Sequence, residues 1–166
     1  PIFHQDKKGL FVGGNFWDGR ATGEVLGNPA ADQALGPFLN PAEQALGVPA
    51  DVVTRVCAAS YGDLFKQVWG EEACDPANVD MAYGQVGLSI AAYEDSPEVN
   101  AFSSKYDLAF DGMTKLSKQE KKGFALFQGK GKCKLCHLTG KDALFTDFTF
   151  DNLGVPVNPE NPAYIA

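Results

Sequence analysis

The chain contains one Cys-x-x-Cys-His sequence, which runs from Cys133 through Cys136 to His137. Two thiols at this spacing add to the vinyl groups on one edge of a haem, and the histidine that follows ligates the iron through a ring nitrogen. The alternatives are a redox disulfide, which normally belongs to a thioredoxin-like βαβ unit, and half of a zinc site. No βαβ pattern is present, and a zinc site would have to use the one other histidine and the two other cysteines. We therefore predict covalent haem c with His137 as an axial ligand.

The other two cysteines, Cys57 and Cys74, are separated by 16 residues that span a predicted helix and its exit. Covalent haem c implies a compartment outside the cytoplasm, where disulfides persist. We expect a Cys57–Cys74 bridge, for which the chain-entropy model gives a stabilisation of roughly 3 kcal/mol. The alternative is a pair of buried free thiols.

The sixth ligand of the iron has no clear candidate in the sequence. Only 29 residues follow His137, and none of them is Met or His. Met81 and Met113 precede the motif and are expected in the core, His4 is expected to pack or lie at the surface, and Tyr164 stands near the end of the chain. We therefore expect this sequence to be a piece of a longer protein.

Composition excludes several classes of protein. The 166 residues are 45% hydrophobic, which is too apolar for intrinsic disorder and suits one domain or one domain and part of another. No uncharged apolar run approaches the ~20 residues needed to span a bilayer. A net charge of −7 argues against general binding to nucleic acid.

The charge is unevenly distributed along the chain. Residues 115–141 hold eight lysines and one acidic residue, a local balance of +7, so the remainder carries −14. One interpretation is a solvated helix face followed by a lysine-rich turn. The other is a basic rim that steers an acidic partner or screens an anionic cofactor.

The spacing of proline, glycine and apolar residues predicts a mostly α chain. Residues 1–28 are rich in glycine and are expected to be loop. Helices are predicted from Pro29 to about Pro37, from Asn40-Pro41 onward, and over 50–60, 61–69, 79–93 and 117–128. Gly84 and Gly87 interrupt the apolar stripe of the 79–93 helix, which indicates close approach of another helix or of a flat ligand.

Several segments, taken in order, resemble the signature of bacterial dihaem cytochrome c peroxidases and their relatives, the MauG-type enzymes. They are 16–21 (FWDGRA), 33–37 (QALGP), 40–43 (NPAE), 145–147 (FTD) and 152–156 (NLGVP), with the Cys-x-x-Cys-His motif before the last two. The resemblance covers nearly the whole chain. The joint pattern is specific although each piece alone is modest.

The resemblance implies a fold and a domain organisation. The fold would be mostly α, a cytochrome c-like haem domain with an extended, loop-rich N-terminal region. Residues 1–49 would be an interdomain segment that contributes to the peroxidatic, or distal, pocket, and residues 50–166 an incomplete C-terminal haem domain. Because the chain holds one haem motif and the family has two, the first haem is expected upstream of Pro1. The sixth ligand, Met in peroxidases and Tyr in MauG-type enzymes, is expected beyond Ala166.

The resemblance also implies residue roles. Glu43 resembles the distal acid/base of the peroxidatic haem, and Gln33 the neighbouring amide. Pro37 resembles the residue that shapes the pocket wall, and Trp17 the aromatic side chain between the two haems. Without the resemblance, Glu43 would be an acidic residue in the first turn of a helix and Trp17 a core aromatic.

Three functions follow from the resemblance and the motif. The first is reduction of hydrogen peroxide, with electrons entering through the C-terminal haem. The second is a MauG-like activity, in which a high-valent dihaem state oxidises residues of a partner protein. The third is a non-catalytic c-type electron carrier. A periplasmic location is expected, with a cytochrome c or cupredoxin donor or a protein substrate, a complementary N-terminal haem domain or chain, and a calcium ion in the complete enzyme.

Overall fold

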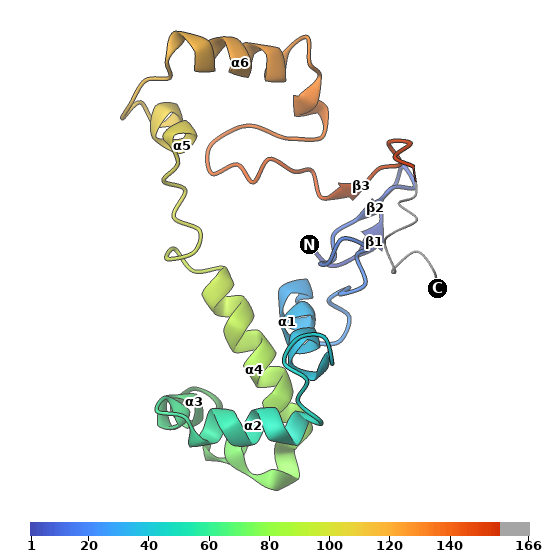
Figure 1. Ribbon diagram of the computed structural model, residues 1–166, viewed down its shortest axis with the longest axis vertical. Coiled ribbons are helices and arrows are strands. Elements are labelled where there is room, and N and C mark those ends of the chain that lie inside the picture. Colours follow the sequence, from blue (N-terminus) through green and yellow to red (C-terminus); the bar gives the residue numbers. More distant parts are fainter. Residues whose placement is uncertain (157–166) are drawn as a thin grey trace.

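The computed structural model describes residues 1–156, and this part of the chain is mostly helical (Figure 1). The α-helices are α1 (Pro29–Leu39), α2 (Pro49–Ala58), α3 (Gly62–Trp69), α4 (Val79–Glu94), α5 (Lys105–Phe110) and α6 (Lys118–Gln128). Short 3-10 turns are η1 (Glu71–Cys74), η2 (Pro76–Asn78) and η3 (Cys133–Leu135), and the strands are β1 (His4–Gln5), β2 (Phe11–Val12) and β3 (Thr149–Phe150). The prediction of a mostly α chain is confirmed. None of the helices in the described part has the length and hydrophobicity needed to cross a membrane.

Helix α1 begins where the sequence predicts and ends later. The Asn28 side chain accepts a hydrogen bond from the N–H of Ala30 at 2.9 Å, and Pro29 occupies the first helical position. The predicted end near Pro37 is wrong by two residues, because the N–H of Asn40 bonds to the carbonyl of Gly36 and closes the last turn.

The segment after α1 is a turn, so the predicted second short helix at Asn40-Pro41 is wrong. The last carbonyls of a helix have no partner within it. Here the N–H of Gln44 bonds to the carbonyl of Pro37 at 3.1 Å, and the N–H of Leu46 bonds to that of Phe38 at 2.9 Å. The chain therefore folds back over the end of α1 instead of starting a new helix.

The hydrophobic core lies where α1, α2, α3 and α4 meet. Its buried members are Val52, Phe65, Ala73 and Val86, and half-buried side chains that pack around them include Phe38, Leu46, Trp69, Tyr83 and Ile90. The hydroxyl of Tyr83 donates to the Leu35 carbonyl at 2.6 Å and ties α4 to α1. The core thus draws on residues from both sides of position 49, and the domain boundary placed there stays a prediction.

Gly87 marks the closest approach of α4 to α1. A Cβ atom at this position would lie 2.8 Å from the carbonyl oxygen of Ala31 and 2.9 Å from a methyl group of Leu35. At Gly84, one turn earlier, a Cβ atom would lie 3.0 Å from the end of the Leu26 side chain. Of the two reasons considered for these glycines, the packing of another helix is therefore the one that the structure supports.

A disulfide joins Cys57 of α2 to Cys74 of η1, in agreement with the expected pairing. The bridge closes a segment that contains α3 and brings its two ends to the edge of the core. Both cysteines are half-buried and pack against the core residues.

Two expectations about sulfur side chains fail. Met81 and Met113 are exposed rather than in the core.

His4 is exposed, which is one of the two positions expected for it, and its Nδ1 lies 2.8 Å from the Ile2 carbonyl. Tyr164 lies outside the described residues.

A small antiparallel sheet joins the two ends of the described chain, with strand order β1-β2-β3. In its register His4 pairs with Val12, and Phe11 pairs with Phe150. The segment expected as loop thus contains two short strands. The sheet fixes residues that follow the haem motif against the N-terminal hairpin.

The elements follow an open path (Figure 1). Helices α2 and α3 lie at one end of the molecule and α6 at the other, with the long α4 and α5 between them. From α6 the chain runs back across the middle to β3, beside the N-terminal strands.

We predict that Gly87→Ala lowers the free energy of unfolding by about 1–3 kcal/mol, because the added methyl group forces α1 and α4 apart. Gly84→Ala is the matched control on the same helix, since it meets only the flexible end of Leu26 and gains helix propensity. Urea unfolding of the two purified variants measures the difference. Equal midpoints would show that the α1–α4 contact is not tight.

Candidate functional site

The Cys-x-x-Cys-His segment forms a compact turn directly after α6. The N–H of Gly131 bonds to the carbonyl of Leu126 at 2.7 Å, and Lys132 adopts a left-handed conformation with φ of 58°. The 3-10 turn η3 then begins at Cys133, and the N–H of His137 bonds to the Cys133 carbonyl at 2.9 Å. The histidine is therefore fixed by its backbone to the first cysteine of the motif.

The side chain of His137 is also held. Its Nδ1 lies 2.8 Å from the carbonyl oxygen of Phe145. A carbonyl oxygen only accepts hydrogen bonds, so Nδ1 carries the proton and Nε2 keeps a free lone pair. This is the tautomer that a metal-ligating histidine needs, and the bond to the carbonyl sets the direction of the ring.

Aromatic side chains surround the Phe145 end of this bond. The Phe145 ring lies 4.9 Å from Tyr106 of α5 and 6.1 Å from Phe127 of α6, both edge to face. The Phe127 ring is also 6.2 Å from the His137 ring, and Tyr106 packs against Phe124 at 5.7 Å. The α6 face that carries Phe124 and Phe127 thus packs against α5 and the loop that follows the motif.

The residues of this region fit a covalently attached haem. Cys133 and Cys136 take part in no disulfide, and the first is half-buried and the second exposed. Large apolar side chains are exposed on α6, η3 and the following loop, namely Leu126, Leu135, Leu138, Leu144 and Phe148. Two available sulfurs, an imidazole with Nε2 free and uncovered apolar surface are the features that haem c attachment requires. When bound, the haem would supply one-electron redox chemistry at the iron.

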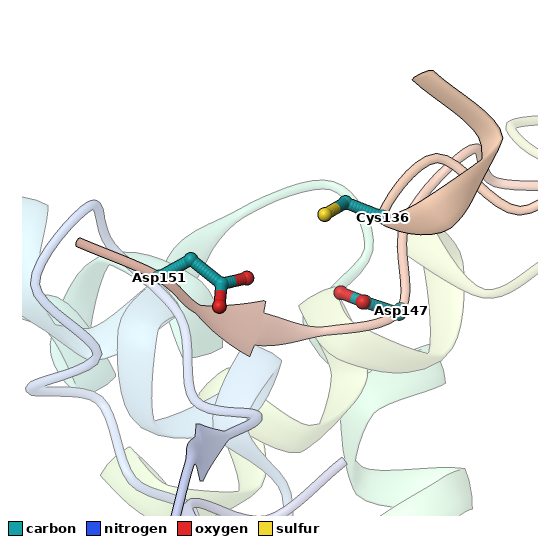
Figure 2. A group of neighbouring side chains, drawn as sticks. All are labelled: Cys136, Asp147 and Asp151. Atoms are coloured by element: carbon teal, nitrogen blue, oxygen red, sulfur yellow. The ribbon is translucent and has the colours of Figure 1, made fainter. Parts of the chain in front are cut away.

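Two acidic residues lie beside Cys136, and the sequence analysis did not select them. Figure 2 shows Cys136, Asp147 and Asp151 turned toward one another, and their ligand atoms lie within 4.8 Å of each other. The hydroxyl of Thr149 lies 2.8 Å from a carboxylate oxygen of each aspartate. A hydrogen bond from the backbone N–H of Thr149 is the main cause that lowers the pKa of Asp147. If Cys136 held the haem through a thioether, no thiolate would remain, and the group would place two carboxylates beside that attachment point. Only Thr149 of these residues lies in β3, and Phe148 has a left-handed φ of 63°, so no regular alternation in the sequence announced the group.

The loop around Trp17 is braced by its neighbours. The Arg20 guanidinium donates to Asp18 at 2.8 Å and lies over the Phe16 ring, 3.7 Å from its centre. Trp17 itself is 60% exposed. The indole therefore lies largely on the surface, and Trp17 is not a core aromatic.

Of the three predicted distal residues, two lie on α1 and the third lies in the turn that follows it. Gln33 and Pro37 are half-buried and one turn apart, so they share a face of the helix. Glu43 is exposed in the turn that folds back over the end of α1, where the amide of Asn40 donates to one of its carboxylate oxygens at 2.7 Å. Helix α1 packs beside α4, whereas α6 lies at the far end of the molecule (Figure 1). The structure therefore separates these residues from His137, and their catalytic roles stay predictions.

Comparison with known proteins identifies the family. A sequence model described as di-haem cytochrome c peroxidase matches residues 5–115, which is more than half of the chain and includes Trp17, Gln33, Pro37 and Glu43. The chain belongs to the di-haem cytochrome c peroxidase family. The family resemblance expected from the sequence is thereby confirmed.

Named relatives extend the similarity to nearly the whole chain. It is 34% identical over 164 residues to the methylamine utilization protein MauG of Paracoccus denitrificans, covering 95% of this chain and 40% of that protein. It is 30% identical over 153 residues to the cytochrome c551 peroxidase of Nitrosomonas europaea, covering 89% of this chain and 40% of that protein. The crystal structure of the diheme peroxidase BthA from Burkholderia thailandensis superposes with a TM-score of 0.79 at 29% identity, covering 99% of this chain and 40% of that one. The chain thus spans about two fifths of the length of each of these proteins.

We predict that haem remains on the polypeptide when the purified protein is treated with acidified organic solvent, because two thioethers hold it. In a variant with Cys133→Ala and Cys136→Ala, only the bond between His137 and iron remains, so the haem should be extracted. The control carries Cys57→Ala and Cys74→Ala. It should keep its haem covalently bound while it loses roughly 3 kcal/mol of stability. Release of haem from the unmodified protein would contradict thioether attachment.

Proposed function

We propose that the complete protein is a periplasmic haem-c peroxidase that reduces hydrogen peroxide, with electrons entering through the haem attached at Cys133 and Cys136 and ligated by His137. The observation that carries this proposal is the placement of Glu43. Its carboxylate is exposed and oriented by Asn40 at the end of α1, on the same segment as Gln33 and Pro37. A protein that only carries electrons would not need a carboxylate and an amide arranged in this way.

Reduction of hydrogen peroxide to two water molecules consumes two electrons and two protons. Glu43 would transfer a proton from one peroxide oxygen atom to the other. The Asn40 amide engages one carboxylate oxygen, which leaves the other free to accept a proton from peroxide. This carboxylate oxygen would then donate the proton to the other oxygen atom of peroxide, which leaves as water. Gln33 would hydrogen-bond the peroxide, and Pro37 would limit the space beside it.

Trp17 is proposed to relay electrons between the two haems. Its support is the braced loop, which leaves the indole 60% exposed and able to pack against a second haem domain. An aromatic ring carried by a braced loop would keep a nearly constant distance to both redox centres.

A basic face next to the haem motif would receive the electron donor. Its members are exposed lysines of α6, of the turn after it and of the following loop: Lys118, Lys121, Lys122, Lys130, Lys132, Lys134 and Lys141. The one acidic residue of this segment, Glu120, is bonded by Lys105 at 2.7 and 2.8 Å. These bonds, followed by those from Ser117, lower the pKa of Glu120 to about 2, so its charge is constant and is balanced by Lys105 of α5. The face therefore stays positive and suits an acidic cytochrome c or cupredoxin.

The location and the cofactors form part of the same proposal. The Cys57–Cys74 disulfide favours an oxidising compartment, which is consistent with the periplasm. One haem c would belong to this chain and a second to a complementary N-terminal haem domain. A calcium ion in the complete enzyme stays a prediction.

The second candidate function is a MauG-type oxidation of a partner protein. The 34% identity to MauG of Paracoccus denitrificans favours it. The two functions differ in what happens to the protein that peroxide oxidises through the enzyme. A peroxidase oxidises a reduced redox protein and returns it unmodified, whereas a MauG-type enzyme leaves covalently altered residues in its partner, which mass spectrometry detects.

We predict that Glu43→Gln lowers peroxide turnover of the complete, haem-loaded enzyme by about 10²–10⁴-fold, because the amide keeps the shape but cannot take up the proton. The absorption spectrum of the His137 haem should not change. Glu98→Gln, which alters an exposed acidic residue after α4, is the control and should retain full activity. Undiminished turnover in Glu43→Gln with both haems loaded would reject the catalytic role.

We predict that replacing Lys130, Lys132 and Lys134 with glutamine slows reduction by an acidic donor about tenfold or more at low salt. In the unmodified protein the rate should fall as salt rises, because the Debye length shortens from ~10 Å at 0.1 M to ~3 Å at 1 M. Lys66→Gln removes a single positive charge from α3, at the opposite end of the molecule, and should leave the rate unchanged (Figure 1). A rate that does not depend on salt would favour a merely solvated lysine face.

A further inference from the structure

We infer that Tyr106 of α5 is a positioning residue for the iron ligand His137 and thereby sets the reduction potential of its haem. Tyr106 is 31 residues before His137 in the sequence and acts through the loop that follows the haem motif. The inference rests on the proposed ligation of iron by His137 and does not depend on which substrate the complete enzyme oxidises.

The hydroxyl of Tyr106 makes two hydrogen bonds to one residue of this loop. It donates to the carbonyl oxygen of Gly140 at 3.1 Å and accepts from the N–H of Gly140 at 3.0 Å. One phenol thus occupies both backbone groups of Gly140, as a neighbouring strand would. These bonds fasten the loop to α5 three residues after His137.

The ring of Tyr106 holds the same loop at its other end. It packs edge to face on Phe145 at 4.9 Å, and Phe127 packs on Phe145 from α6 at 6.1 Å. Phe145 has a φ of 56°, a left-handed conformation that a bulky residue adopts only when its surroundings impose it. Tyr106 and Phe127 supply these surroundings.

The carbonyl of this strained residue is the one that accepts the Nδ1 proton of His137. A hydrogen bond at Nδ1 makes the imidazole a more basic ligand, which favours ferric over ferrous iron and lowers the reduction potential. If the loop loosens, this bond lengthens and the potential rises. The phenol hydroxyl of Tyr106 therefore controls the electronic character of His137 without touching it.

Tyr106→Phe tests the inference, because it removes the two bonds to Gly140 and keeps the ring. In the complete haem-loaded protein, a spectroscopic redox titration of the His137 haem should show the ferric-to-ferrous ratio at a fixed solution potential lowered by about three- to tenfold. A tenfold change corresponds to ~59 mV for a one-electron couple. The ring-proton NMR signals of His137 should shift as well.

Two variants serve as controls. Phe110→Leu removes a ring that packs on Tyr106 but leaves the bonds to Gly140, so the potential should not change. Tyr93→Phe removes a phenol hydroxyl from an exposed residue of α4 and should also have no effect. An unchanged potential and unchanged His137 signals in Tyr106→Phe would overturn the inference and leave Tyr106 as a packing residue.

A measurement on the unmodified protein tests the same contact independently of any variant. The Gly140 amide should exchange its proton with solvent more slowly than the amides on either side, because the Tyr106 oxygen accepts it. Exchange as fast as that of its neighbours would also overturn the inference. None of these readouts uses peroxide turnover. A shifted potential in an enzyme that does not reduce peroxide would reject the proposed function and support the role of Tyr106.

Discussion

The hydrogen bond from Nδ1 of His137 to the carbonyl of Phe145 is the constraint around which the haem region is organised. The bond has two requirements. The His137 ring must point in a fixed direction from the turn after α6, and the following loop must place the Phe145 carbonyl within hydrogen-bond distance of Nδ1. The bond from the His137 N–H to the Cys133 carbonyl satisfies the first requirement. The left-handed backbone of Phe145, held by Tyr106 and Phe127, satisfies the second. A free Nε2 lone pair is the chemical result, and the two cysteines fix where a haem would meet it.

The small sheet connects this region to the segment that carries Trp17. The N–H of Gly13 bonds to the carbonyl of Phe148 at 2.8 Å, and Phe150 pairs with Phe11. A Cβ atom on Gly19, two residues after Trp17, would lie 2.9 Å from the Phe3 ring, which itself packs against Phe150. The loop beyond His137 and the loop of Trp17 therefore share one packed unit. A displacement of either loop has to be accommodated by the other, although α6 and α1 lie far apart in the fold.

Local signals in the sequence were sufficient for most helices and for the haem motif. The start of α1 at Pro29 and the helices predicted over 79–93 and 117–128 depend on neighbours within a few residues, and all three predictions are confirmed. The turn after α1 could not be predicted, because it depends on carbonyls of Pro37 and Phe38 that are satisfied only once the chain folds back. Tyr106 was missed for the same reason, since its partner Gly140 is 34 residues away.

Positive and negative side chains flank the haem motif, and they differ in how exposed they are to solvent. The lysines of the basic face are exposed, so dissolved salt screens them, and in the proposed reaction they would act mainly on the approach of a partner. Asp147 is half-buried and receives bonds from the N–H and hydroxyl of Thr149, which keep it ionised and in place beside Cys136. A fixed negative charge beside the attachment point of a haem would favour the more positive oxidation state of its iron and would be less affected by salt. In the proposed reaction, the surface charge would set how fast a donor arrives, and the held carboxylate would act on the reduction potential of the haem.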